Sequence, residues 1–175
     1  MKKTVLALIA IPAFVCAVGA CADGATKKAE AEAAPAPQTF LHEAAVGGLA
    51  EVELGKLAQQ NASSAAVKDF ASTMVNDHGK ANQELESLAQ KENVTLPTQL
   101  DAKHTALRDR LAKLNGAAFD RAYMTEMVKD HQKDVAEFRA ESKSSTNADV
   151  KAFAVKTLPV LEGHLQMAKD VQQKL

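Results

Sequence analysis

The sequence predicts an all-α protein built as an antiparallel bundle of four long helices, and two observations lead to this prediction. The 175-residue chain is rich in Ala, Leu, Lys, Glu and Gln, which favour helices, while aromatic residues make up only 4% and Trp is absent. Two short motifs also occur twice, which indicates two related helical hairpins. The pairs are MVNDH at 74–78 with MVKDH at 127–131, and VKDFA at 67–71 with VKAFA at 150–154.

The first long helix is predicted over residues 39–60. Thr39 can cap its amino end, because a threonine side chain can accept a hydrogen bond from the first turn. The helix contains Gly47, Gly48 and Gly55, and glycine in a helix interior costs about 1 kcal/mol relative to alanine. These glycines therefore predict a neighbouring backbone that approaches closely.

The second long helix is predicted over residues 65–92, after a polar turn at 61–64. Its apolar residues recur with spacings of three and four, as in an amphipathic helix. His78 lies within this apolar stripe and not on the opposite face. The helix is therefore expected to turn one histidine towards the core.

The second half of the chain repeats this plan after a connecting segment. A shorter crossover helix is predicted over 98–114, and the third and fourth long helices over 117–142 and 148–174. Pro159 lies inside the last of these, where it removes one backbone donor and is expected to kink the helix. The short turns make the helices of each hairpin antiparallel, and the crossover returns the third helix to the same end as the first. This is a ferritin-like topology.

The first 20 residues have the features of a secretion signal, with two lysines followed by an apolar segment at 5–18. This segment is too short for a permanent membrane span. The sequence Val-Gly-Ala-Cys that follows resembles a bacterial lipobox, which implies cleavage before Cys21 and lipidation of its thiol. Cleavage after Ala22 would instead leave an unanchored protein. We therefore predict an exported protein that faces the periplasm and is anchored to the outer membrane by a lipid on Cys21.

Two further parts follow the predicted signal. Residues 21–38 are rich in Ala, Lys, Glu and Pro without apolar periodicity, which predicts a flexible tether. Residues 39–175 form the predicted bundle domain. The only other cysteine, Cys16, lies within the signal, so the mature domain is expected to have no disulfide.

Four polar residues are expected to meet in the middle of the bundle. Glu51, His78, His131 and His164 each lie about 12 to 16 residues into a different long helix, by counting along the predicted helices. Antiparallel helices of similar length align at their midpoints, so these side chains should lie at similar depth. Burying a polar group without a partner costs about 2 kcal/mol or more, so they need either one another or a metal ion.

Three imidazoles and a carboxylate can bind zinc, copper or iron. Met74 and Met127 lie one helical turn before His78 and His131 and are weaker candidate ligands. A thioether together with imidazole would favour copper. The alternative is that the histidines form hydrogen bonds in the core and that the methionines only pack there.

Other polar residues are predicted to have supporting or peripheral positions. Asp77 and Asp130 lie about 100° around the helix from the neighbouring histidines, so they are expected to contact the site from the side or from a neighbouring helix. Tyr123, the only tyrosine, is predicted to form a hydrogen bond with a carboxylate or a histidine. His42 and His104 are predicted to be peripheral.

Several functional classes are disfavoured. A di-iron oxidase of the ferritin type would show Glu-x-x-His on two helices, and this motif is absent from the sequence. There is also no serine nucleophile elbow and no Gly-rich phosphate loop. The formal net charge of −1 gives no electrostatic reason to expect nucleic-acid binding.

A set of motifs spread over residues 40–175 carries a family resemblance. They are GGLAEVELGKLA at 47–58, VKxFAxxMVxDHxxAN at 67–82, FDxxY at 119–123, MVxDH at 127–131 and LPxLxxHL at 158–165. With these motifs the chain resembles the bacterial domain-of-unknown-function family 4142, whose members are often labelled predicted outer-membrane proteins. The resemblance implies a ferritin-like four-helix bundle and supplies no known activity. A lipid anchor would make the membrane label compatible with a helical domain.

The sequence therefore leads to two functional hypotheses. The first is a lipid-anchored envelope protein that binds a transition metal through His78, His131 and His164, with Glu51 as a fourth candidate ligand, and that serves metal handling or envelope stress protection. The second is a structural or interaction module in which the same residues form a buried hydrogen-bond network. An enzyme is the less favoured interpretation, because no catalytic motif accompanies the histidines.

Overall fold

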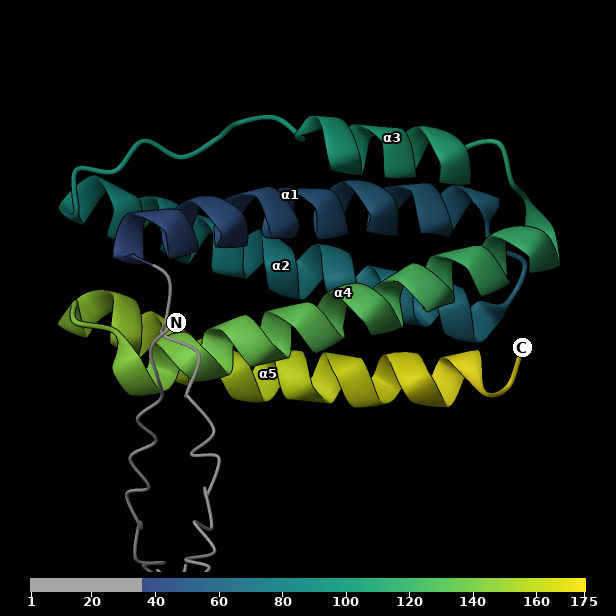
Figure 1. Ribbon diagram of the computed structural model, residues 1–175. Helices are drawn as coiled ribbons and strands as arrows, with labels where there is room; N and C mark the ends of the chain where they lie inside the picture. Colours follow the sequence, from purple (N-terminus) through teal and green to yellow (C-terminus); the bar gives the residue numbers. More distant parts are fainter. Residues whose placement is uncertain (1–35) are drawn as a thin grey trace, which may run out of the picture. The chain divides into compact units, whose positions relative to one another are not determined.

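The computed structural model describes residues 36–175, which form five α-helices and no strand (Figure 1). The predicted all-α class is confirmed for this part of the chain. None of these helices is long and apolar enough to cross a membrane. The predicted signal at 1–20, the lipidation at Cys21 and most of the predicted tether lie outside the described residues. The helices are α1 (Pro37–Asn61), α2 (Ala65–Lys91), α3 (Ala102–Leu111), α4 (Gly116–Ser144) and α5 (Ala148–Gln172).

The four long helices pack as two hairpins that face each other. α1 lies along α2, α4 lies along α5, and short turns at 62–64 and 145–147 join the helices of each pair (Figure 1). Contacts of α2 with α5 and of α1 with α4 close the bundle, and α3 lies against α1 and α4. The predicted order of hairpin, crossover helix and hairpin is therefore present.

Helix ends differ from the predicted ones by a few residues. α1 begins at Pro37, which suits the first turn of a helix because that turn has no use for the missing N–H. Thr39 therefore lies inside the helix, and its predicted role as N-cap is wrong. The crossover helix is shorter than the predicted 98–114, because it begins only after Asp101, whose side chain accepts a hydrogen bond from the backbone N–H of His104.

The three glycines of α1 have different surroundings. A Cβ atom on Gly48 would lie 2.0 Å from Oδ1 of Asn82, and one on Gly55 would lie 3.1 Å from the carbonyl oxygen of Ala71. Gly55 therefore lets the backbone of α2 approach α1 closely, as the sequence predicted, whereas Gly48 leaves room for a side chain of α2. Gly47 has no atom within 4 Å of the same point, so the prediction is wrong for this residue.

A buried carboxylate from α4 holds the turn between α1 and α2. Asp120 is only 2% exposed, and its two oxygens accept hydrogen bonds from the turn. Ser63 donates from its backbone N–H at 3.1 Å and from its hydroxyl at 2.6 Å, and the backbone N–H of Ser64 donates at 3.0 Å. Asp120 thus satisfies the N–H groups just before the first turn of α2.

Replacing Asp120 with alanine is expected to lower the free energy of unfolding by about 2–4 kcal/mol, because three hydrogen bonds to a charged acceptor are lost together. The Asp120→Asn variant keeps one carbonyl acceptor and should lose less. Urea unfolding followed by circular dichroism measures both changes. Asp109→Ala, at an exposed position on α3, is the control, and a loss below about 1 kcal/mol for Asp120→Ala would contradict this role.

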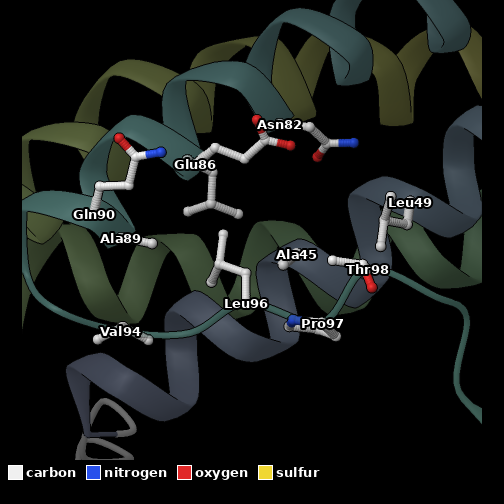
Figure 2. Close-up of a pocket in the computed structure, with 11 residues that line it drawn as sticks. Ala45, Leu49, Asn82, Glu86, Ala89, Gln90, Val94, Leu96, Pro97 and Thr98 are labelled. Carbon is white, nitrogen blue, oxygen red and sulfur yellow. The ribbon is translucent and has the colours of Figure 1, made fainter.

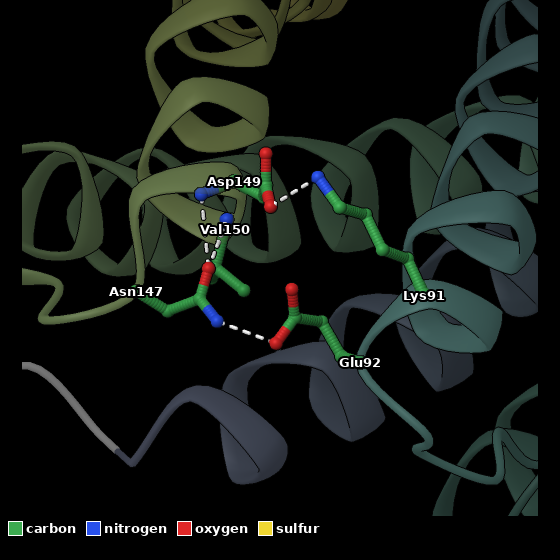
Figure 3. A network of polar contacts seen from close by, with 5 residues as sticks. All are labelled: Lys91, Glu92, Asn147, Asp149 and Val150. Carbon is green, nitrogen blue, oxygen red and sulfur yellow. Dashed lines mark hydrogen bonds and ion pairs between the residues drawn. The ribbon is translucent and has the colours of Figure 1, made fainter.

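At the opposite end, a polar network ties the end of α2 to the start of α5 (Figure 3). The Asn147 side chain caps α5 by accepting hydrogen bonds from the backbone N–H groups of Asp149 and Val150, at 2.9 and 3.0 Å. Its amide group also donates to Glu92, while Lys91 donates to Asp149. One asparagine therefore fixes the start of α5 and links it to the first hairpin.

The segment between α2 and α3 runs back over the first hairpin and leaves a groove of about 330 Å³ beneath it (Figure 2). Val94, Leu96 and Pro97 form one wall, and residues of α1 and α2 such as Ala45 and Leu85 form the other. No histidine lines this groove. Two of its lining residues, Asn82 and Leu85, also line a smaller cavity that reaches His78.

Candidate metal centre

The core of the bundle consists of two apolar clusters with a polar layer between them. One cluster includes Leu54, Met74, Met127 and Ala168, and the other includes Phe40, Leu85, Val135 and Leu161. On every long helix the two clusters are separated by a buried polar residue. These residues are Glu51 on α1, His78 on α2, His131 on α4 and His164 on α5, all 7% exposed or less.

The structure brings the three imidazole rings together. The ring centroids of His78 and His131 are 5.7 Å apart, those of His78 and His164 are 5.4 Å apart, and those of His131 and His164 are 5.5 Å apart. One nitrogen from each ring lies within 4.8 Å of the other two. Two nitrogens bound to one tetrahedral ion lie about 3.4 Å apart, so a shift of about 1 Å would bring these three to bonding distance.

Two of the rings are held by a hydrogen bond on the side that faces away from their free nitrogen. Nδ1–H of His131 donates to the backbone carbonyl of Met127 at 2.9 Å, and Nε2–H of His164 donates to Oδ2 of Asp77 at 3.1 Å. The remaining nitrogens, Nε2 of His131 and Nδ1 of His164, are buried without a partner, as is Nε2 of His78. Each such atom costs about 1–3 kcal/mol in the folded protein.

The three rings are neutral at neutral pH. Burial lowers the pKa of His78 to about 3, with a further contribution from His131 and His164, and it lowers the pKa of His131 to about 4. Burial also lowers the pKa of His164, against the opposing effect of its hydrogen bond to Asp77. A neutral imidazole has a free lone pair on one nitrogen, which is the form that binds metals.

Glu51 lies beside the histidines but outside the group of three. Its Oε1 is 3.7 Å from Nδ1 of His131, the nitrogen that donates to Met127, and its Oε2 is buried without a partner. Burial raises the pKa of Glu51 well above its usual value, and the charges of Asp134 and Asp130 raise it further. The carboxyl group therefore approaches the site from behind one ring, and its role as fourth ligand stays a prediction.

The other residues singled out from the sequence have varied positions. Met74 and Met127 are fully buried in the apolar cluster next to the histidine layer. Asp77 reaches His164 on the neighbouring helix, as predicted, and His42 is exposed. The predicted hydrogen bond of Tyr123 is wrong, because its buried hydroxyl has no partner among the described residues.

Sequence reasoning missed one titratable group near the site. Burial raises the pKa of Asp134 to about 7, and the charges of Glu137 and Asp130 act in the same direction. Asp134 follows His131 by three residues, so the two share a helix face. The spacing from His131 was the one signal in the sequence that Asp134 lies near the site. The sequence does not show that α1 packs against this face of α4 and buries the carboxyl group.

Comparison with known proteins supplies a family match and a shared fold. The family described as "Domain of unknown function (DUF4142)" matches residues 22–171, and no curated protein matches the chain. A DUF305 fragment from Deinococcus radiodurans has a similar structure, with a TM-score of 0.71 and 14% identity over 82% of this chain and 99% of that chain.

Two more solved structures share the fold. CopM in the Cu(II)-bound form has a TM-score of 0.68 and 16% identity, over 81% of this chain and 98% of that chain. A DUF305 protein from Streptomyces coelicolor, described as secreted, has a TM-score of 0.66 and 15% identity, over 79% of this chain and 92% of that chain. At these identities the likeness concerns the fold alone.

Proposed function

The chain belongs to the DUF4142 family of domains of unknown function, and we propose that it binds one transition-metal ion through His78, His131 and His164. Two observations support this most: the three buried rings each bring a nitrogen within 4.8 Å of the other two, and each ring has one buried nitrogen without a partner. Histidines that bind metals are typically oriented by a hydrogen bond from the other ring nitrogen to a carboxylate or a carbonyl, and His131 and His164 have this arrangement.

We propose copper as the ion, bound as Cu⁺. The ligands are three neutral imidazoles in an apolar core, and the cost of burying an ion rises with the square of its charge, so a monovalent ion is favoured over Zn²⁺. Imidazole and the nearby thioethers are also suitable ligands for copper. CopM, which has a similar fold, is known in Cu(I)-bound and Cu(II)-bound forms, and this supports the choice.

The setting of this function is part of the proposal. We infer an exported protein of ferritin-like topology that is held at the outer membrane by a lipid on Cys21 and that handles metal or protects the envelope from metal stress. The signal features of residues 1–20 support export, and so does the neighbour described as secreted. The buried site suits retention of an ion better than catalysis, because the three rings are packed between apolar clusters.

Elemental analysis of the purified, untagged protein tests the metal site. The protein is equilibrated separately with Cu⁺ under reducing conditions, with Zn²⁺ and with Fe²⁺, and is then desalted. We expect one copper ion to be retained per chain. Retention of zinc or iron in place of copper would correct the choice of ion, and no retained metal would overturn the proposed function.

Asp77 is expected to support the site through His164. Replacing Asp77 with alanine removes the acceptor that orients this ring and should weaken copper binding about 10- to 100-fold. Asp77→Asn keeps an oxygen acceptor without its charge and should lie between the two. Competition with a coloured Cu⁺ chelator measures the affinities. Asp69→Asn, an exposed position on the same helix, is the control, and equal affinity of wild type and Asp77→Ala would contradict this role.

A further inference from the structure

Two small cavities meet at the seam between α1 and α4. The outer cavity, of about 80 Å³, is lined by α1, α4 and the start of α3, and the inner cavity, of about 30 Å³, is lined by all four long helices. Glu43, Gly47 and Asp134 belong to the walls of both. The two cavities are therefore neighbours along one path from the seam into the bundle.

The inner cavity ends at the candidate metal site. His78 is the member of the histidine group that lines it. A volume of about 30 Å³ is enough for about two water molecules, so an ion that has lost most of its hydration shell fits as well. His78 would thus be the first ligand that an arriving ion meets.

Gly47 keeps the junction of the two cavities open. Apart from its own stretch of helix, a Cβ atom at this position would have no atom within 4 Å, although the residue lies in the interior of a helix and lines both cavities. Glycine is unfavourable there by about 1 kcal/mol, and close packing does not require it, in contrast to Gly48. The structural effect of this glycine is therefore the space that it leaves free at the junction of the two cavities.

The outer cavity is lined by more acidic than basic side chains. The acidic residues are Glu43, Glu51, Asp101, Asp130 and Asp134, and the basic ones are Lys103, His104 and Lys133. Lys133 is already paired with Glu137 at 2.9 Å. A second observation is that Glu51, which lines the cavity and is only 3% exposed, has a buried oxygen, Oε2, without a hydrogen-bond partner. A passing cation or its water would supply the missing partner.

We propose that the metal ion enters and leaves the three-histidine site through this seam, where the carboxyl groups of Asp130 and Asp134 attract it, Glu51 offers its unpartnered oxygen and Gly47 leaves the opening into the inner cavity. This inference rests on the proposed metal site and adds its access path. A path of this kind controls rates and not affinity. Blocking it should slow uptake and release by the same factor, whereas damage to the ligands speeds release and weakens binding.

The experiment measures release of Cu⁺ from the loaded protein to an excess of a coloured chelator, at concentrations where the rate no longer depends on the chelator. Equilibrium competition with the same chelator gives the dissociation constant, and the ratio of the two gives the uptake rate. Gly47→Phe places a ring in the open space and is expected to slow release at least about tenfold, with the dissociation constant unchanged within about threefold. Gly163→Phe, at an exposed helical glycine with equally open surroundings, is the matched control and should leave both values unchanged.

A second variant keeps the test decisive if Gly47→Phe does not fold. At pH 8, above the pKa of Asp134, Asp130→Asn combined with Asp134→Asn removes two attracting charges with little change in shape, and uptake should slow about tenfold and depend less on salt. Asp109→Asn combined with Asp170→Asn is the control for charge. Unchanged rates in the folded seam variants would overturn the path while leaving the metal site intact. A wild type that takes up no copper would overturn the proposed function and the path together.

Discussion

Replacing His131 with leucine is expected to stabilise the metal-free protein by about 1–2 kcal/mol and to remove its copper binding. In the metal-free protein Nε2 of His131 is fully buried without a partner, and an apolar side chain of similar volume removes that cost. The same change deletes one of three ligands, so copper affinity should fall by more than the 10- to 100-fold typical of a supporting residue. The order of stabilities should therefore depend on the metal.

With copper at about 1000 times the dissociation constant of the wild type, the wild type gains about 4 kcal/mol, whereas the His131→Leu variant gains less than about 1.5 kcal/mol. Urea unfolding of both proteins with and without Cu⁺ measures this reversal. His42→Leu, at an exposed histidine of α1, is the control and should bind copper normally. Leucine that destabilises the metal-free protein by more than about 2 kcal/mol would instead favour the second hypothesis, in which the histidines form a structural hydrogen-bond network.

The level at which the histidines meet could be predicted because it follows from local properties of the sequence. The long helices have similar lengths and short turns, so counting residues along each helix places His78, His131 and His164 at one depth. The apolar stripe gave the direction of each side chain. These arguments need no knowledge of how one helix is rotated against its neighbour.

Partners across helices could not be predicted in this way. Asp120 is adjacent to Phe119 in an apolar stripe, and only the packed structure shows that it reaches the turn between α1 and α2. Tyr123 was expected to form a hydrogen bond, but its hydroxyl lies where the packing leaves it without a partner. Such contacts depend on the rotation and offset of two helices, which differ by a fraction of a turn.

The surroundings of Gly47 could not be predicted from the sequence either. Three glycines in one helix predicted close approach of a neighbour, which holds for Gly48 and Gly55. The sequence does not distinguish a glycine that relieves a contact from one that leaves a space. That distinction requires the position of α4, which packs against α1 on the side of Glu43, Gly47 and Glu51.

Copper affinity is expected to fall by less than about 30-fold between pH 7.5 and pH 5, although histidine ligands usually release metals more readily in this range. Protons compete with a metal only below the pKa of the ligand in the folded protein. Burial lowers that pKa to about 3 for His78 and to about 4 for His131, and it also lowers the pKa of His164. His78 and His131 are therefore neutral at pH 5, so only protonation of His164 is left to compete with copper at that pH.

Ordinary histidines with a pKa near 6.5 would each lose about 30-fold in binding at pH 5, so three of them would lose about 10⁴-fold. Competition titrations at fixed pH values, corrected for protonation of the chelator, separate the two outcomes by several orders of magnitude. A fall in affinity centred near pH 6.5 would show that the rings are solvated in solution. Circular dichroism at each pH value confirms that the protein remains folded.

The stability of the metal-free protein should depend on pH through two opposing sets of groups. The unfolded chain protonates its histidines below about pH 6.5 while the folded protein does not, so the contribution of His78 and His131 to stability is lost as the pH falls. Asp134, whose pKa is raised to about 7, and Glu51 bind protons in the folded protein first and act in the opposite direction. In the His131→Leu variant one of the histidine contributions is absent. Its free energy of unfolding should therefore fall less than that of the wild type between pH 7 and pH 5, by about 2 kcal/mol.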